Sequence, residues 1–346
     1  MSKLRSIGRR TMVGALSALT LGLSFHVAVA QTADKADRDA ANKEGKVVWY
    51  TSTPMAQASA IAKAFESETG VKVELFRSGG SAVLRRFLQE SAAGRIAVDV
   101  LTTSDPAAFA SMARKGTFVP FRPANFDKLP EEARAADGAF FAQRLNIMTI
   151  YLRGDRVAAA DAPKTWTDLL DPKYKGKMVM TDPSFTSLQL SVVGMLAKNR
   201  GWDFYEKLKA NDIMIVQGNE QVSDMIKRGE RMIAVGALDS YAAEDRKEGH
   251  NIVTVFPSEG TFLIPSPTAV VKGGPNPNAA KLLAEFMLSD TAQKLFPTAG
   301  GYAARMDMDP PQGSPAVKDI KVIPVDYDYT EKQSAQIKRR FNEVFQ

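Results

Sequence analysis

Small hydroxyl residues and glycines gather at several points where a strand-like run gives way to a helix-like run. Residues 72–76 alternate polar and apolar side chains, residues 83–88 repeat apolar ones at helical spacing, and Ser-Gly-Gly-Ser at 78–81 lies between them. We expect Ser81 to cap the first turn of that helix, where backbone N–H groups lack partners within the helix. Free N–H donors beside hydroxyls are typical of an anion site, although one such sequence alone is more commonly a plain turn and cap.

The same arrangement recurs along the chain, and this repetition favours the anion site. Strands are predicted at residues 46–50, 98–101, 177–180, 213–216, 232–235 and 252–256, with polar turns at 51–54, 102–105, 181–184, 218–219, 236–240 and 257–260. Strand, turn and helix in succession predict an α/β fold with mostly parallel sheets flanked by helices. The carboxyl ends of parallel strands lie along one edge of a sheet, so the turns should meet at such edges.

Two apolar runs, residues 144–152 and 268–271, are predicted to be strands that pass between two lobes. Polar turns on both walls of a cleft between lobes allow it to close around a small molecule. We expect ligand contacts from Thr51, Ser52, Ser78, Gly79, Gly80, Ser81, Thr103 and Ser104 on one wall, and from Ser184, Phe185, Thr186, Asn219 and Tyr241 on the other. Arg77 could add a forked contact, although a charged residue at a strand end is more commonly solvated.

The first thirty residues have the composition of a secretory signal peptide. Basic residues within the first ten positions precede an apolar run that ends Ala28-Val29-Ala30, so cleavage is expected after Ala30. The Arg9-Arg10 pair leaves both the general and the twin-arginine export routes open. The chain has no cysteine and therefore no disulfide and no lipoprotein anchor. We expect a freely diffusing protein in the periplasm of a Gram-negative cell.

The charge of the chain argues against nucleic acid as a partner. Lys and Arg number 45 against 39 Asp and Glu, and the signal segment holds four of the basic residues and none of the acidic ones. The mature chain therefore has a net charge of about +2, without a basic run or a basic-aromatic patch.

Catalytic arrangements are weak in this sequence. The mature chain has one histidine, His250, beside a glycine at an expected helix end, and no Gly-x-Ser-x-Gly elbow precedes a helix. The carboxylates near the expected turns are Asp105, Asp182, Glu220, Asp239 and Glu259, and two acting together would need a spacing that sequence does not reveal. Asp239 is expected either to cap its helix or to orient Tyr241. We therefore predict a binding protein that is not an enzyme and needs no cofactor.

Four segments resemble the ferric-binding branch of the periplasmic solute-binding proteins. They are KVVWYTSTP at 46–54, AFESETGVKVELFRSGG at 64–80, PKTWTDLLDPKYKGKMVMTDPS at 163–184 and ALDSYAAEDRKEG at 237–249. The resemblance implies the two-lobed type II periplasmic-binding fold, with residues 31–144 plus 268–346 as lobe 1 and residues 145–267 as lobe 2. It also implies a monomer that delivers its ligand to an inner-membrane ABC permease. A receptor that passes its signal to a membrane kinase would use the same fold.

The resemblance also bears on the ligand. Ferric members hold iron with a histidine, a glutamate and an adjacent tyrosine pair, which fall at or near Pro54, Val83 and Tyr241-Ala242 in this sequence. Only Tyr241 is retained, so no metal site is expected and bare Fe(III) is disfavoured. The hydroxyls and N–H groups at these turns suit a small organic anion such as a phosphonate, a phosphate ester or a carboxylate. Ferric iron or an iron chelate is the alternative ligand.

Overall fold

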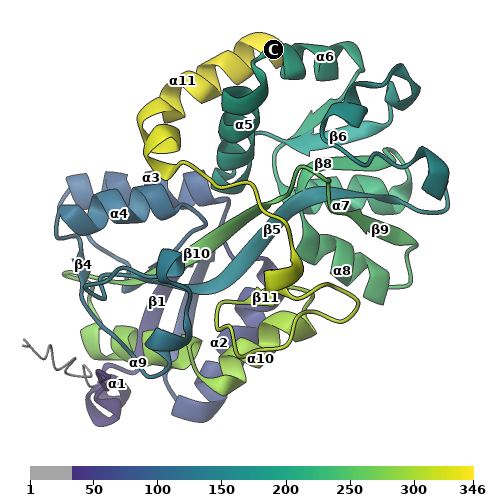
Figure 1. Cartoon of the computed structure of the whole chain (residues 1–346). Helices are drawn as coiled ribbons and strands as arrows, with labels where there is room; N and C mark the ends of the chain where they lie inside the picture. The colour runs from purple at the N-terminus through teal and green to yellow at the C-terminus, as the bar shows by residue number, and fades with distance from the viewer. Residues whose placement is uncertain (1–32) are drawn as a thin grey trace, which may run out of the picture. The chain divides into compact units, whose positions relative to one another are not determined.

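Strands that alternate with helices make up most of the structure (Figure 1). The computed structural model describes residues 33–346, and the predicted signal peptide lies outside that range. The strands are β1 (Lys46–Thr51), β2 (Lys72–Arg77), β3 (Val100–Thr102), β4 (Phe118–Val119), β5 (Phe141–Arg153), β6 (Met178–Thr181), β7 (Met214–Val216), β8 (Ile233–Leu238), β9 (Ile252–Val255), β10 (Phe262–Val271) and β11 (Tyr302–Ala303). The helices are α1 (Arg38–Glu44), α2 (Met55–Thr69), α3 (Gly80–Ala92), α4 (Pro106–Arg114), α5 (Ser187–Arg200), α6 (Asp203–Ala210), α7 (Asn219–Arg228), α8 (Asp239–Lys247), α9 (Pro277–Met287), α10 (Asp290–Thr298) and α11 (Tyr327–Phe345).

One hydrogen-bonded sheet connects the two halves of the structure, in the strand order β2-β1-β3-β10-β5-β8-β6-β7. Strand β1 pairs in parallel with β2 and β3, and β6 pairs in parallel with β7 and β8. Between these groups, β10 and β5 run antiparallel to each other and to β3 and β8. The predicted α/β class is confirmed, and the two expected parallel sheets are joined through β10 and β5.

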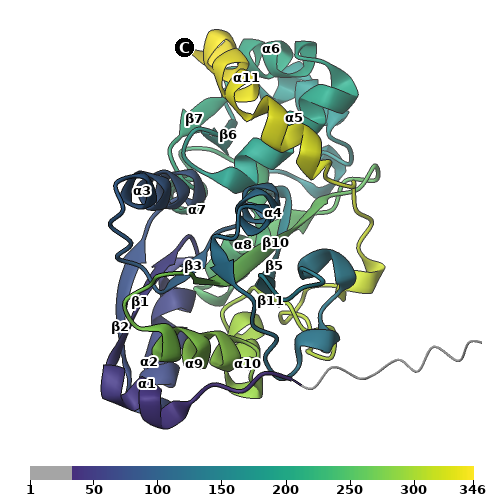
Figure 2. The same ribbon diagram turned by 90° about the vertical axis from the view of Figure 1, so that its left-hand side faces the viewer.

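Two large hydrophobic cores flank this sheet and define two lobes. The first lobe is the part of the chain packed around Trp49, Phe65 and Leu283, and the second lobe is the part packed around Trp166 and Tyr205. In Figures 1 and 2, helices α1, α2, α9 and α10 cover one end of the structure, and α5, α6 and α11 cover the other.

The chain passes between the lobes within its longest strands. Ile147 on β5 belongs to the first core and the next residue, Met148, belongs to the second. On β10, Ile264 packs in the second core and Val270 in the first. The lobe limits expected at residues 144 and 268 stay a prediction. Those limits put residues 327–345 in lobe 1, whereas α11 packs on the second core.

The helix starts differ in part from the expectation. Asp105 caps α4 by accepting a hydrogen bond from the N–H of Ala108 at 3.0 Å, as its place before Pro106 predicts. Ser81 does not cap α3, because that helix begins at Gly80 and Gly79 is its N-cap residue. The expectation for Ser81 was wrong because Gly79, two residues earlier, already has the extended backbone of a cap position.

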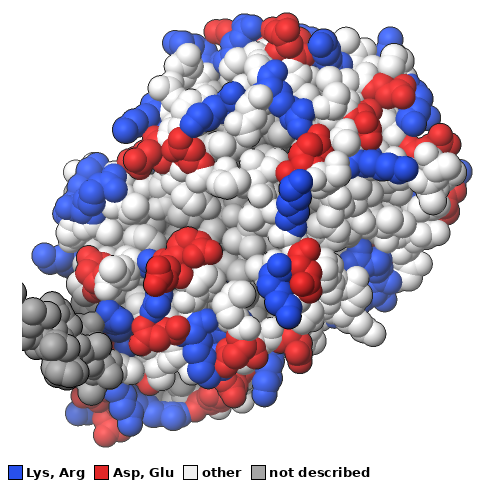
Figure 3. All heavy atoms as spheres, in the orientation of Figure 1, with Lys and Arg blue, Asp and Glu red and all other residues white. Residues whose placement is uncertain are grey.

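Charged side chains of both signs are interspersed over the surface drawn in Figure 3. This distribution agrees with the small net charge expected from the sequence. Among the helices of residues 33–346, none combines the length and the apolar character that crossing a membrane requires.

The buried carboxylate of Asp99 connects two parts of the first lobe. It is fully buried and accepts hydrogen bonds from the N–H of Val48 on β1 at 2.7 Å and from the N–H of Asn276, the N-cap residue of α9, at 2.7 Å. A third bond comes from the Asn276 side-chain amide at 2.8 Å. Asp99 and Asn276 are 177 residues apart, so this one carboxylate joins segments that are distant in the sequence.

Asp99→Asn should lower the free energy of unfolding by about 1–3 kcal/mol, because an NH₂ group would replace one acceptor oxygen and leave a buried N–H unpaired. Urea denaturation followed by circular dichroism measures this loss. Asp39→Asn, at an exposed position in the first turn of α1, is the matched control and should change stability by less than about 0.5 kcal/mol. Equal losses in the two variants would show that the Asp99 contacts do not stabilise the fold.

Candidate ligand-binding site

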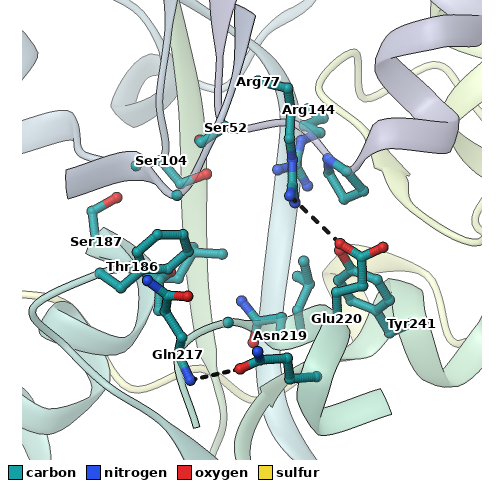
Figure 4. Close-up of a pocket in the computed structure, with 18 residues that line it drawn as sticks. Ser52, Arg77, Ser104, Arg144, Thr186, Ser187, Gln217, Asn219, Glu220 and Tyr241 are labelled. Carbon is teal, nitrogen blue, oxygen red and sulfur yellow. Dashed lines mark hydrogen bonds and ion pairs between the residues drawn. The ribbon is translucent and has the colours of Figure 1, made fainter. Parts of the chain in front are cut away.

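A cavity lies between the lobes and opens to solvent (Figure 4). Turns from both lobes line it, as the sequence predicts. The expected residues found in its wall are Ser52, Gly79, Gly80, Ser104, Phe185, Thr186, Asn219 and Tyr241. The expected residues outside its wall are Thr51, Ser78, Ser81, Thr103 and Ser184.

Local structure explains why several neighbours of the lining residues are excluded. The Thr51 hydroxyl bonds the Thr53 hydroxyl at 2.8 Å, within the protein. The backbone N–H of Ser78 donates to the Thr51 carbonyl at 3.2 Å, and that of Thr103 donates to the Pro267 carbonyl at 3.2 Å. Ser184 belongs to a turn in which its N–H donates to the Asp182 carboxylate at 2.6 Å. These residues shape the turns behind the wall.

Three helices direct their N-termini at the cavity. Its lining residues include the starts of α3 (Gly79, Gly80), α5 (Thr186, Ser187) and α7 (Gly218, Asn219). Among the described residues, no side chain caps any of these three starts. Each therefore presents the positive end of a helix dipole and backbone N–H donors, a combination that binds anions, although at α3 the N–H of Ser81 is already bonded to the Phe185 carbonyl and that of Gly80 remains.

Polar side chains complete the wall. Ser104 shares a 2.6 Å hydrogen bond with Ser266, which links the cavity to the interlobe strand β10. The buried Ser52 hydroxyl and the buried Asn219 side-chain oxygen have no hydrogen-bond partner within residues 33–346. Burial raises the pKa of Tyr241 to about 12, although Arg77 opposes this shift. At neutral pH Tyr241 is therefore a phenol that can donate a hydrogen bond.

Two arginines supply the positive charge: Arg77, which the sequence offered as a possible contact, and Arg144, which it did not indicate. Arg77 at the end of β2 donates through Nε to the Thr53 carbonyl at 3.2 Å, which points its guanidinium into the cavity. Arg144 on β5 is only 1% exposed. Its guanidinium donates a hydrogen bond to Oδ1 of Asn146.

The buried Arg144 has no counter-ion in the described part of the chain, and its Nε has no hydrogen-bond partner there. Burial lowers the pKa of Arg144 to about 9, and the nearby Arg77 adds to this shift while Tyr241 opposes it. A guanidinium that is dry, unpaired and beside a second guanidinium is costly unless an anion joins it. In the sequence, the one feature that could have indicated this site is the lone charge of Arg144 in a mostly apolar strand. Arginine is rarely buried without a partner, so such a charge points to a missing counter-ion.

The two lobes touch beside the cavity at Gly79, Gly80, Phe185 and Ser187. A Cβ atom built on Gly79 would lie 2.6 Å from the Phe185 carbonyl oxygen, and one on Gly80 would lie 2.3 Å from the Ser187 hydroxyl. The N–H of Ser81 donates to the same Phe185 carbonyl at 3.2 Å. The close approach of the lobes therefore requires a residue without a side chain at 79, where the obstacle is backbone, whereas at 80 the Ser187 hydroxyl could rotate away.

The positions that correspond to iron ligands are unsuited to iron. Val83 and Ala242 are buried in hydrophobic clusters, and Pro54 and Tyr241 remain in the cavity wall. Within residues 33–346 no three His, Cys, Asp or Glu side chains gather as a metal site would require. Asp239 accepts a hydrogen bond from Thr254 at 2.8 Å and is the first residue of α8, whose N-cap is Leu238. The expected capping role of Asp239 is therefore wrong.

Comparison with known proteins identifies the family. The model of the bacterial extracellular solute-binding proteins matches residues 96–333. The chain belongs to this family. A Haemophilus influenzae protein described as uncharacterised is 28% identical to this solute-binding protein. The match covers 88% of the present chain and 92% of the relative. A putative 2-aminoethylphosphonate-binding periplasmic protein of Salmonella typhimurium is 25% identical over 71% of this chain and 74% of the relative.

Solved structures share the fold of this solute-binding protein. The fructose-6-phosphate-bound AfuA of Actinobacillus pleuropneumoniae has a TM-score of 0.77 at 20% identity, covering 87% of this chain and 98% of AfuA. The iron-bound HitA of Pseudomonas aeruginosa has a TM-score of 0.74 at 20% identity, covering 86% and 99%. The two-lobed fold of the ferric-binding-protein-like branch is confirmed. The protein is a binding component of an ABC-type transporter, from a family of extracellular or periplasmic proteins that are not enzymes.

Gly79→Ala should weaken ligand binding by about 1–3 kcal/mol, because the new methyl group collides with the Phe185 backbone and holds the lobes apart. The backbone of Gly79, at φ −63° and ψ 148°, suits alanine, so the thermal midpoint of the ligand-free protein should be unchanged. Calorimetry measures the affinity, and small-angle X-ray scattering measures the separation of the lobes. Gly218→Ala is the control, because its Cβ would lie 3.4 Å from the Phe185 ring. Equal affinities in both variants would contradict a close-contact role for Gly79.

Proposed function

We propose that this solute-binding protein binds a small organic anion in the cavity between its lobes and delivers it to the permease of its transporter. The observation that carries the proposal is Arg144, a guanidinium 1% exposed and without a carboxylate partner in the described chain. An anion in the cavity would supply the missing charge, and the desolvated setting strengthens the attraction.

The cavity wall supports an acid group with several oxygens. The wall offers several hydrogen-bond donors to a ligand. They are two guanidiniums, the N-termini of α3, α5 and α7, and the hydroxyls of Ser52 and Tyr241. A phosphonate, a phosphate ester or a carboxylate accepts bonds from such a set of donors. The names of the Salmonella relative and of the AfuA structure, which mention a phosphonate and a sugar phosphate, support this ligand class.

Bare ferric iron is supported less well, although HitA was solved with iron. Fe(III) needs several anionic oxygens or a histidine, and of the ligand positions only Tyr241 can offer an oxygen. Cationic Arg77 and Arg144 in the same wall would repel a bare cation. An iron chelate with an anionic surface is compatible with these charges.

The remaining parts of the functional hypothesis rest on the sequence. We propose export to the periplasm of a Gram-negative cell with cleavage after Ala30, and action as a monomer. We propose lobe limits near residues 144 and 268, as the sequence predicts, but we place α11 with lobe 2, because Ile337 and Phe341 pack in the second core. Closure of the cleft would be the change that the permease detects, and a ligand shifts it only by binding the closed form more tightly.

A thermal-shift screen of the metal-stripped mature protein tests the ligand class. We expect a rise in midpoint with one or more of the phosphonates, sugar phosphates, phosphoglycerates or carboxylates, since a ligand stabilises the folded state that binds it. Ferric iron with and without citrate or carbonate belongs in the same screen. A rise with bare iron alone would contradict the organic-anion proposal.

Arg144→Gln should reduce affinity for the anion about 10- to 100-fold, because one charged donor is lost, worth about 1.5–3 kcal/mol. The ligand-free midpoint should fall little, since the charge that is removed has no carboxylate partner in residues 33–346. Arg144→Lys is the matched control, which keeps the charge without the planar fork and should bind with intermediate affinity. Calorimetry that finds all three proteins equal would remove Arg144 from the site.

Tyr241→Phe should weaken binding by about 1–3 kcal/mol if the phenol donates to the bound anion. The same titration measures this loss, and phenylalanine keeps the ring that packs in the second core. An unchanged dissociation constant would place the Tyr241 hydroxyl outside the ligand contacts.

A further inference from the structure

One cavity residue does not fit a site built only for an anion. Glu220 is the sole acidic residue in the wall formed by the described residues, where it stands at the second position of α7. Its Oε2 lies 3.6 Å from Nη1 of Arg77 on the opposite lobe, and its side chain is 62% exposed (Figure 4). A carboxylate in this position repels any acid group that approaches Arg77.

Structural roles account poorly for this carboxylate. An acid in the first turn of a helix is favourable, yet the contribution is small when the side chain is largely exposed. The contact with Arg77 is longer than a hydrogen bond, and an ion pair with one exposed partner contributes little to stability. A role toward the ligand explains why Glu220 faces the cavity and not the surrounding solvent alone.

The charges of the wall define what would complement them. Arg77 and Arg144 together with Glu220 leave the cavity with a net charge of +1. A purely anionic group placed beside both arginines also lies close to Glu220, because Glu220 is within 4 Å of Arg77. A ligand with a cationic group on the Glu220 side would replace that repulsion with attraction.

We propose that Glu220 is a specificity residue and that the ligand is a compact zwitterion. Its acid group would bind Arg77, Arg144 and the helix N-termini, and its ammonium group would bind the Glu220 carboxylate. The 3.6 Å separation of Arg77 and Glu220 requires the two ligand charges to be joined by a short linker, as in an aminoalkyl phosphonate or a small amino acid. This inference rests on the proposed anion site and adds the second charge to it.

Two pairs of probes test the inference by calorimetry at pH 7. Each pair keeps the acid group and differs in the ammonium group: 2-aminoethylphosphonate with ethylphosphonate, and 3-aminopropanoate with propanoate. The wild-type protein should bind the amino member of at least one pair about tenfold or more tightly than its partner. Glu220→Gln should remove that preference and bind the plain acid as well as or better than the wild type does.

A matched control separates local from general charge effects. Glu230→Gln removes the same charge two residues beyond the end of α7, at an exposed position outside the cavity wall, and should keep the wild-type preference. A preference for the plain acids, or a preference that survives in Glu220→Gln, would overturn the role of Glu220. Failure of both pairs while a phosphate ester without a cationic group binds would overturn the zwitterion and leave the anion site standing. Failure of every anion in the screen would overturn both proposals.

Discussion

Backbone hydrogen bonding at the ends of two parallel sheets is the constraint on which this structure depends. Strands β3 and β8 would each leave one edge of buried N–H and C=O groups unpaired, and such groups must find partners. Strands β10 and β5 supply them, each pairing antiparallel with one sheet and with each other. The lobes are therefore joined along their backbones, and both irregularities of register in these strands, at Ser266/Pro267 and between Thr149 and Tyr151, lie close to the passage between the cores. Bending between the lobes has to be absorbed there, where the ladders are already interrupted.

The ligand cavity inherits its chemistry from this arrangement. Parallel strands on either side of the joint end facing one another, so the helices that follow them point their N-termini into a shared space. Arg144 lies on β5 itself, with its neighbour Asn146 bonded to Ser104 and Ser266. A group that binds Arg144 thus contacts the joining strand directly, and through Asn146 it is connected with β10. Contacts from the second lobe, such as Tyr241 and Thr186, would then decide how far the cleft closes.

Much of this could be predicted from the sequence because the signals were local. Strand and helix positions followed from periodicity, and the polar turns followed from their composition.

The sequence did not indicate which residue of each turn faces the ligand. Ser52 and Ser104 reach the cavity while their neighbours Thr51 and Thr103 do not, because successive residues of extended chain point to opposite sides. The sequence could not decide that alternation without knowing which face is buried. Arg144 was missed, and Arg77 was considered but judged more commonly solvated, because the burial and pairing of a charge depend on residues far away in the chain. The short helices α1 and α6 were missed because too few turns were present to show a periodic pattern.

The packing of α11 has a consequence for how the protein can be made. Ile320 belongs to the first core and Ile323 already packs against the second, so within residues 33–346 the chain crosses between lobes a third time before its final helix. Ile337 and Phe341 on that helix complete the second core beside residues from positions 150 to 264, while the first core joins Val47 to Leu283 and Ala303. Neither lobe corresponds to an uninterrupted length of chain. Folding that depends on contacts so distant in sequence is slow, because long loops must close before the contacts can form. During synthesis from the N-terminus, the first core is incomplete until about Ile320 has emerged and the second until α11 has emerged, so neither lobe can finish folding early.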